Sequence, residues 1–210
     1  MSYKVFQNKK INHLEQPMFL GEGVNTARYD LVKFPYFDKL VDRQLEQFWR
    51  PEEVNISKDS TDWKSLTAAE QHIFVSNLKR QILLDSVQGR GPNAALLPVV
   101  SVPELETWIE NWGMNETVHS RSYTYILKNL FVEPNIIFDQ IMDNKEIVDC
   151  AEQLTVYYDD FIEYSSYYNL LGLGKHSIKK DDGSTIELNI TMKELNKKLL
   201  LMIASINVLE

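Results

Sequence analysis

Cysteine, glycine and proline are all scarce in this sequence of 210 residues. The single cysteine, Cys150, cannot form a disulfide within one chain. Because disulfides persist mainly in oxidising compartments, one cysteine favours a reducing, cytoplasmic setting. Only 8 glycines and 7 prolines interrupt the chain, which leaves room for long helices.

Long apolar runs and an excess of basic residues are missing as well. The longest apolar runs, Ala94–Val100 and Leu199–Ala204, are far shorter than the roughly 20 residues that cross a bilayer. The N-terminal MSYKVFQNKK lacks the apolar core of a secretory signal. With 22 Lys and Arg against 30 Asp and Glu, the net charge is -8, which argues against a nucleic-acid-binding surface. We therefore expect neither a membrane nor a nucleic acid as partner.

What is present is an ordinary globular composition, with 44% hydrophobic and 25% charged residues, and helical periodicity. Segments that begin at Thr67, Ser101 and Thr191 carry the Ser/Thr-x-x-Glu capping box that starts a helix. The expected helices cover about Tyr36 to Arg50, Thr67 to Gly89, Pro103 to Leu130, a short segment after Pro134, Lys145 to Leu171, and Thr191 to Glu210.

Three segments depart from the helical pattern. Residues 1–30 are mixed and are predicted to form an extended arm, and the polar stretch 55–63 is predicted to be a connection. Residues 176–190 are predicted to form a small β-hairpin, because Asp182-Gly183 is a turn signal and apolar residues alternate behind it. The expected fold class is therefore all-α with a small β-hairpin insertion.

The segment Glu116-Thr-Val-His119 is the strongest candidate for chemistry. Residues i and i+3 share one face of a helix, so both side chains can reach one metal ion. Glu-x-x-His recurs in di-iron carboxylate helix bundles, and iron accepts mixed carboxylate and imidazole ligands. The short motif also arises by chance. The alternative is a surface Glu, or a core Glu116 that meets an arginine, beside an ordinary His.

Asp85 and Glu210 are two further acids in unusual places. Asp85 lies on an apolar face near the end of its helix, where the helix dipole disfavours a negative charge. Either a bound cation or a basic residue such as Arg90 would neutralise it. Glu210 continues an apolar helix face, although a terminal Glu is usually solvated.

Two aromatic residues could take part in electron transfer. Tyr123 lies one helical turn after His119, where an oxidised metal could remove an electron and a proton from it. The indole of Trp49 could carry an electron, although both residues are also ordinary core aromatics. A complete four-helix di-iron site needs a second Glu-x-x-His, and this sequence contains only one.

Longer motifs surround these residues: PMF near the start, ARYD (27–30), FWRPEEV (48–54), LLDSVQGR (83–90), SVPELETW (101–108), ETVHSRSYT (116–124) and SINVLE (205–210). Together they resemble the small, radical-bearing subunit of class I ribonucleotide reductase of the bacterial and phage type. The resemblance covers the chain from about Gln16 onward and implies a ferritin-like helical bundle. It also implies a carboxylate-bridged di-iron centre that uses O₂ to oxidise a tyrosine to a radical. That radical passes to a large catalytic subunit, which reduces ribonucleoside diphosphates for deoxyribonucleotide synthesis and DNA replication.

The resemblance also implies roles for individual residues. Asp85, Glu116 and His119 match ligands of the first iron, and Glu116 would bridge the two irons. Glu210 matches a ligand of the second iron. Tyr123 matches the radical tyrosine, and Trp49 matches a tryptophan on the electron-transfer route.

Members of that family continue well past this length, through further helices, the remaining ligands and a tail that docks on the large subunit. Residues 1–210 are therefore expected to be the N-terminal part of an incomplete ferritin-like domain. We expect no stable tyrosyl radical in the lone chain and an exposed Leu199, Ile203 and Ile206 face on its last helix. A second chain carrying the C-terminal half would complete the subunit, which would be a homodimer. The alternatives are an inactive fragment that at most binds partners, another di-iron bundle, or a manganese–iron pair.

Overall fold

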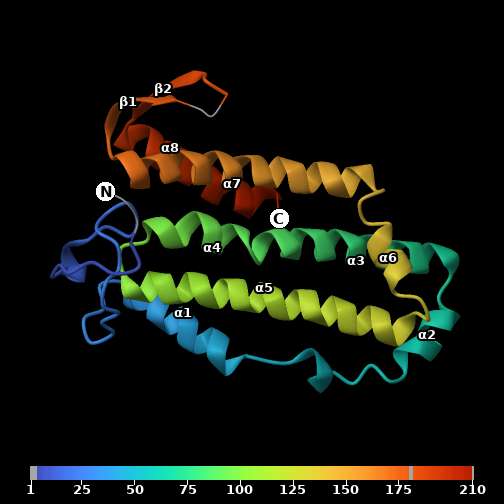
Figure 1. Cartoon of the computed structure of the whole chain (residues 1–210). Helices are drawn as coiled ribbons and strands as arrows, with labels where there is room; N and C mark the ends of the chain where they lie inside the picture. The colour runs from blue at the N-terminus through green and yellow to red at the C-terminus, as the bar shows by residue number, and fades with distance from the viewer. Residues whose placement is uncertain (1–3, 180–181, 210) are drawn as a thin grey trace. The chain divides into compact units, whose positions relative to one another are not determined.

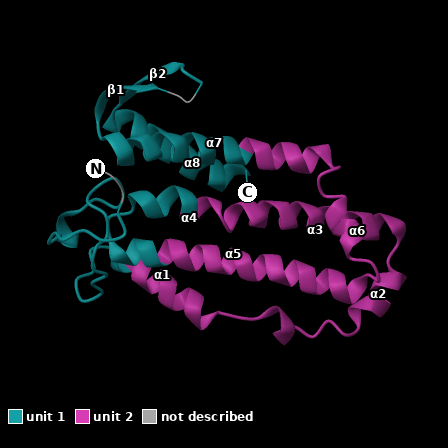
Figure 2. Ribbon diagram, viewed as in Figure 1, with its two compact units in different colours: residues 1–35, 94–107, 154–210 teal, residues 36–93, 108–153 magenta. Residues whose placement is uncertain are grey.

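A computed structural model describes residues 4–179 and 182–209. Within these ranges the chain forms eight α-helices, three short 3₁₀ helices and one two-stranded sheet (Figure 1). None of the described helices combines the length and the apolar character that crossing a membrane requires. The chain divides into two compact units (Figure 2): unit 1 is Met1–Pro35, Ala94–Thr107 and Leu154–Glu210, and unit 2 is Tyr36–Asn93 and Trp108–Gln153. The expectation that residues 1–210 are the N-terminal part of one ferritin-like domain stays a prediction.

Unit 2 is built around α3 (Ala68–Gln88) and most of α5 (Pro103–Leu130), which lie side by side (Figure 2). The predicted capping box starts α3, because the Thr67 hydroxyl accepts from the Glu70 N–H and the Glu70 carboxylate accepts from the Thr67 N–H. Both helices contribute to one buried apolar cluster, which consists of Leu78 and Ile82 from α3, Leu127 from α5, and Ile141, which follows α5. This packing fixes the two helices that carry the candidate site.

The other helices of unit 2 include two corrections to the sequence prediction. Helix α1 is Pro35–Glu46 and ends before the expected Arg50, which is extended (φ -114°, ψ 144°), as the residue before a proline usually is. The stretch 55–63 is not only a connection, because it contains most of α2 (Asp59–Ser65). The acids of its first turn, Asp59 and Asp62, favour a helix start. Helix α6 is Asn135–Asp139, with Pro134 as its N-cap, as expected.

Unit 1 contains the end of α4 (Gly91–Leu96), the first turn of α5, most of α7 (Lys145–Leu171) and α8 (Met192–Leu209). The Lys198 ammonium joins α8 to α7 by donating to both carboxylate oxygens of Asp160, at 2.7 and 2.6 Å. The largest side chains of α7 and α8 that are fully buried in this unit are Tyr158, Phe161, Leu154, Leu195 and Met202.

The first part of unit 1, residues 4–34, has little regular structure beyond a 3₁₀ turn at His13–Glu15 and one β-bridge between Phe19 and Val100. It is tethered by the start of α5. The Ser101 hydroxyl accepts the Gly21 N–H at 2.9 Å, and Glu104 Oε1 accepts the backbone N–H groups of residues 33 and 34. The pattern at 101–104 therefore marks the start of a helix, but its side chains bind the N-terminal segment.

The expected hairpin is confirmed, and it begins two residues earlier than predicted. Strands β1 (Gly174–Lys179) and β2 (Thr185–Ile190) pair antiparallel, with Gly174 opposite Ile190 and Lys179 opposite Thr185. Gly183 has φ +84°, a left-handed conformation that suits glycine and explains the turn signal.

The prediction that the last helix exposes Leu199 and Ile206 is wrong. Leu199 is only 6% exposed and Ile206 is also buried, because α8 buries a stripe at three- and four-residue spacing: Leu195, Leu199, Met202 and Ile206. The exposed apolar side chains are Leu200, Leu201 and Val208. Glu210, the expected ligand at the end of this helix, lies outside the described residues.

Candidate metal centre

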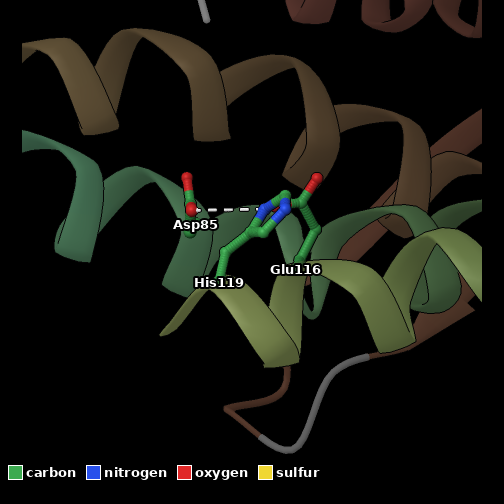
Figure 3. A group of neighbouring side chains, drawn as sticks. All are labelled: Asp85, Glu116 and His119. Atoms are coloured by element: carbon green, nitrogen blue, oxygen red, sulfur yellow. Dashed lines mark hydrogen bonds and ion pairs between the residues drawn. The ribbon is translucent and has the colours of Figure 1, made fainter. Parts of the chain in front are cut away.

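Helices α3 and α5 bring Asp85, Glu116 and His119 together in unit 2 (Figure 3). One possible ligand atom of each residue lies within 4.8 Å of those of the other two. The His119 Nδ1 atom is 3.1 Å from Glu116 Oε2 and 3.7 Å from Asp85 Oδ2. Three of the residues singled out as possible ligands therefore form one group, although they come from two separate parts of the sequence.

Local structure explains the approach of the two helices. Glu116 and His119 lie three residues apart on one face of α5, and Asp85 lies in the last turn of α3. Gly89 ends α3 with a right-handed φ of -64°, not with the left-handed conformation that is typical after a helix. A Cβ at position 89 would lie 3.2 Å from the Asp85 carbonyl oxygen and 3.7 Å from Glu116 Cβ. The tight contact is thus with the backbone of α3 itself, whereas the 3.7 Å distance to Glu116 Cβ is an ordinary van der Waals contact between the two helices.

Glu116 is a buried acid with two polar partners. Its residue is 8% exposed, and the Trp112 indole N–H donates to Oε1 at 2.8 Å while Oε2 faces His119. Its partners are thus a tryptophan and a histidine, not the arginine of the alternative interpretation. The sequence motifs did not reveal this hydrogen bond, although the i, i+4 spacing of Trp112 and Glu116 permits it.

Asp85 is a second acid of this group, half-buried and also with polar partners. Burial, first of all, and the nearby charge of Glu116 raise the pKa of Asp85, whereas the hydrogen bond from Tyr123 and the charge of His119 lower it. The Tyr123 hydroxyl donates to Asp85 Oδ2 at 2.5 Å. The contacts of this carboxylate are therefore with Tyr123 and His119 rather than with Arg90.

Tyr123 connects the acidic group to the apolar core of unit 2. Its ring is half-buried and packs against the cluster that contains Leu78, Ile82 and Leu127. The other side of the group is open, since the His119 side chain is 43% exposed. The three candidate ligands and the candidate radical residue thus occupy one site at the edge of an apolar core.

The two remaining candidates are not part of this group. Trp49 is half-buried in coil after α1, and the described hydrogen bonds and ring contacts do not join it to Asp85, Glu116 or His119. Its role stays a prediction. Glu210 lies outside the described residues, so its place relative to the group is also a prediction.

The donor set fits a transition-metal ion. Two carboxylates and an imidazole are ligands that iron, manganese and zinc accept. Metal–ligand bonds of about 2.0–2.2 Å separate the donor atoms of one ion by up to about 4.4 Å, so small side-chain rotations from the present spacing suffice. A cation would also remove the repulsion between the two half-buried or buried carboxylates.

Residues 28–178 match the family described as "Ribonucleotide reductase, small chain". The chain belongs to this family. A ribonucleoside-diphosphate reductase subunit beta from Buchnera aphidicola subsp. Baizongia pistaciae is 53% identical over 210 residues, which is 100% of this chain and 54% of that protein. The subunit beta from Enterobacteria phage T4 is 45% identical over 158 residues, covering 75% of this chain and 41% of that protein. The chain thus spans about half the length of the curated relatives it matches.

Solved structures confirm the fold class. A ribonucleotide reductase R2 subunit from Clostridium botulinum superposes with a TM-score of 0.70 at 22% identity, covering 82% of this chain and 54% of that one. The resemblance inferred from the motifs and the expected ferritin-like, all-α fold are both confirmed.

Proposed function

We propose that this chain provides part of the two-metal, radical-generating centre of a ribonucleotide reductase small subunit. Asp85, Glu116 and His119 would hold the first metal, for which we propose iron, and Glu116 would bridge to the second. The observation that carries the proposal is the hydrogen bond from Tyr123 to Asp85 Oδ2 at 2.5 Å, because it joins an oxidisable side chain to this donor group.

The bound metal pair, with O₂ as oxidant, would supply the oxidising equivalent that removes an electron from Tyr123. Residues of the chain would accept the proton that leaves with it. As the Tyr123 ring loses its electron, its hydroxyl proton can move along the existing hydrogen bond to Asp85 Oδ2. The apolar cluster around the ring limits the access of water to the radical.

Two residues have proposed roles that rest on the sequence resemblance. Glu210 would be a ligand of the second metal, and Trp49 would carry an electron between the centre and its partner subunit. Their support is the match of SINVLE and FWRPEEV to the family's motifs. The cofactor performs the oxidation, while the protein positions it and controls its access.

The partners are also part of the proposal. The curated relatives are named ribonucleoside-diphosphate reductase subunit beta, which supports a cytoplasmic role in deoxyribonucleotide synthesis with a large catalytic subunit. A ferritin-like di-iron site needs two Glu-x-x-His motifs, and this chain contains a single one, Glu116 to His119. We therefore propose that a second polypeptide supplies the C-terminal half and that the completed subunit is a homodimer.

Electron paramagnetic resonance tests this function. The chain should be co-expressed with the C-terminal half of the Buchnera relative and treated with Fe(II) and O₂. A tyrosyl doublet is expected in the pair and not in the lone chain. Tyr123→Phe should abolish it, whereas Tyr125→Phe should keep it, because the Tyr125 hydroxyl contacts the Val54 carbonyl at 3.5 Å and not the donor group.

Two results would contradict the proposal. A doublet that persists in Tyr123→Phe would assign the radical to another residue. The absence of any doublet, together with substoichiometric iron in every sample, would identify an inactive fragment. A parallel sample loaded with Mn(II) and Fe(II) tests the mixed-metal alternative, which predicts that equal amounts of manganese and iron are retained in the pair.

A further inference from the structure

One outward-facing side of α8 changes character halfway along the helix. Its first half is polar and exposed, with Lys193, Asn196 and Lys197. Its second half continues at the same three- and four-residue spacing with exposed apolar residues. These four residues, which we call the α8 stripe, are Leu200, Leu201, Ala204 and Val208.

The α8 stripe is strongly exposed. Leu200 is 66% and Val208 is 79% exposed, while Leu199, next to Leu200, is buried in the core. Exposing a leucine that could be covered forgoes roughly 1.5–3 kcal/mol of hydrophobic free energy. Single exposed apolar residues are ordinary, but several at helical spacing are typical of an interaction surface.

We infer that the α8 stripe is the docking surface for an apolar helix of the polypeptide that corresponds to the rest of the relatives' length. This inference rests on the proposed function and specifies where its second polypeptide binds. The chain covers only 54% of the Buchnera relative, so a large part of that protein has no counterpart here. The polar first half of the same side shows that the apolar character is local and not a general feature of the surface.

The candidate metal centre gives an independent reason for a partner of this kind. Its donor group comes from two helices and is open at His119, which is 43% exposed. A four-helix site takes its remaining ligands from two more helices, one of which carries Glu-x-x-His. Because Glu210 of this chain is proposed as one of these ligands, the partner has a defined chemistry: a helix with an apolar face that also carries Glu-x-x-His.

A second copy of this chain is a poorer occupant of the stripe, because it accounts for none of the relatives' remaining length. We therefore assign the α8 stripe to the complementary polypeptide rather than to self-association.

Co-purification with a defined partner tests this assignment. The tagged full chain is co-expressed with the C-terminal half of the Buchnera relative, and the molar ratio of the two is measured after purification. A ratio near one to one is expected. Leu200→Glu should lower the retained partner by about tenfold or more, since it places a charge in an apolar interface. Asn196→Glu, one turn earlier with the same new charge, should change it by no more than about twofold.

Because both positions are exposed, both variants should keep the helical circular dichroism and melting temperature of the lone wild-type chain. Equal retention of the partner by Leu200→Glu and Asn196→Glu would overturn the assignment, and so would the absence of any complex. Sedimentation that shows a homodimer dissociated by Leu200→Glu would assign the stripe to a second copy instead.

The Tyr123→Phe variant separates this inference from the proposed function. It should bind the partner as wild type does while it lacks the radical. Partner binding through the α8 stripe without any radical in the wild-type pair would leave the docking assignment standing and reject the proposed chemistry. A radical in a pair whose partner retention is unchanged by Leu200→Glu would support the proposed chemistry and reject the docking assignment.

Discussion

Helices α5 and α8 depart from the ordinary amphipathic pattern in opposite ways. On α5, the acid Glu116 occupies a buried position in a stripe of aromatic and apolar residues. On α8, Leu200 and Val208 occupy exposed positions where polar residues are normal. A buried charge is costly unless it is paired or bound to a cation, and an exposed apolar stripe is costly unless it is covered.

The two departures also differ in how far the chain itself compensates them. Glu116 accepts a hydrogen bond from Trp112 and contacts His119, and the neighbouring Asp85 accepts one from Tyr123. These contacts prearrange donor atoms for an ion. The α8 stripe is strongly exposed in the described chain. Under the two proposals made above, α5 receives a small ligand and α8 receives a polypeptide.

The largest expected effect is a loss of stability that distinguishes the buried side of α8 from the α8 stripe. Leu199→Ala should destabilise the lone chain by about 2–5 kcal/mol, because it opens a cavity at a buried position. Leu200→Ala should change the stability by no more than about 0.5 kcal/mol, because the side chain is exposed. Urea denaturation followed by circular dichroism measures both. Equal losses would break the distinction between the buried side and the α8 stripe.

A substitution at Trp112 should sharpen the picture of α5. Trp112→Phe keeps an aromatic ring but removes the N–H donor to Glu116 Oε1. Affinity for Fe(II), measured without oxygen, should fall by about 10–100-fold, the usual effect of losing a partner of a metal ligand. Trp108→Phe is the matched control, because Trp108 lies one turn away, with its ring centroid 5.5 Å from that of Trp112. The indole that donates to Glu116 is that of Trp112. If both variants bind iron equally well, the hydrogen bond does not position Glu116.

The smallest effect concerns the charge on Asp85. Its raised pKa means that the folded chain holds this proton more tightly than the unfolded chain does. The metal-free wild type should therefore gain stability from this group as pH falls through the raised pKa toward the ordinary value of 3.8. Asp85→Asn carries no charge at this position. At pH 7 its free energy of unfolding should therefore exceed that of wild type by about 1 kcal/mol or less.

Thermal melts in the presence of a chelator check this dependence. The advantage of Asp85→Asn over wild type should shrink steadily as the pH is lowered. A difference between the two proteins that stays constant with pH would show that burial and Glu116 do not destabilise the charged form of Asp85.

Local sequence signals predicted much of the fold. The capping box at Thr67 and the uninterrupted period up to Leu130 were sufficient to place α3 and α5. The turn at Gly183 was sufficient to place the hairpin. Boundaries that depend on competing local effects were missed, as at the end of α1 and in α2. The buried side of α8 was also mistaken for an exposed one, because periodicity identifies an apolar face but not what covers it.

The site shows the same limit. The spacing of Glu116 and His119 predicted a shared face, and the apolar surroundings marked Asp85 as unusual, but the contact between α3 and α5 is tertiary. The i, i+4 spacing of Trp112 and Glu116 permits a bond between them, but whether the indole N–H reaches the carboxylate depends on side-chain placement that a linear pattern does not contain. Trp49 and Glu210 were selected by resemblance alone, and their roles stay predictions.

The central claim is that α3 and α5 hold one half of a two-metal centre and that a second polypeptide supplies the rest. Metal counting under anaerobic Fe(II) tests it most directly, on the lone chain and on the chain co-purified with the C-terminal half of the Buchnera relative. The account predicts at most one iron per lone chain, lost in Glu116→Gln, and two irons per chain in the pair. Two tightly bound irons in a stable, monomeric lone chain would contradict it.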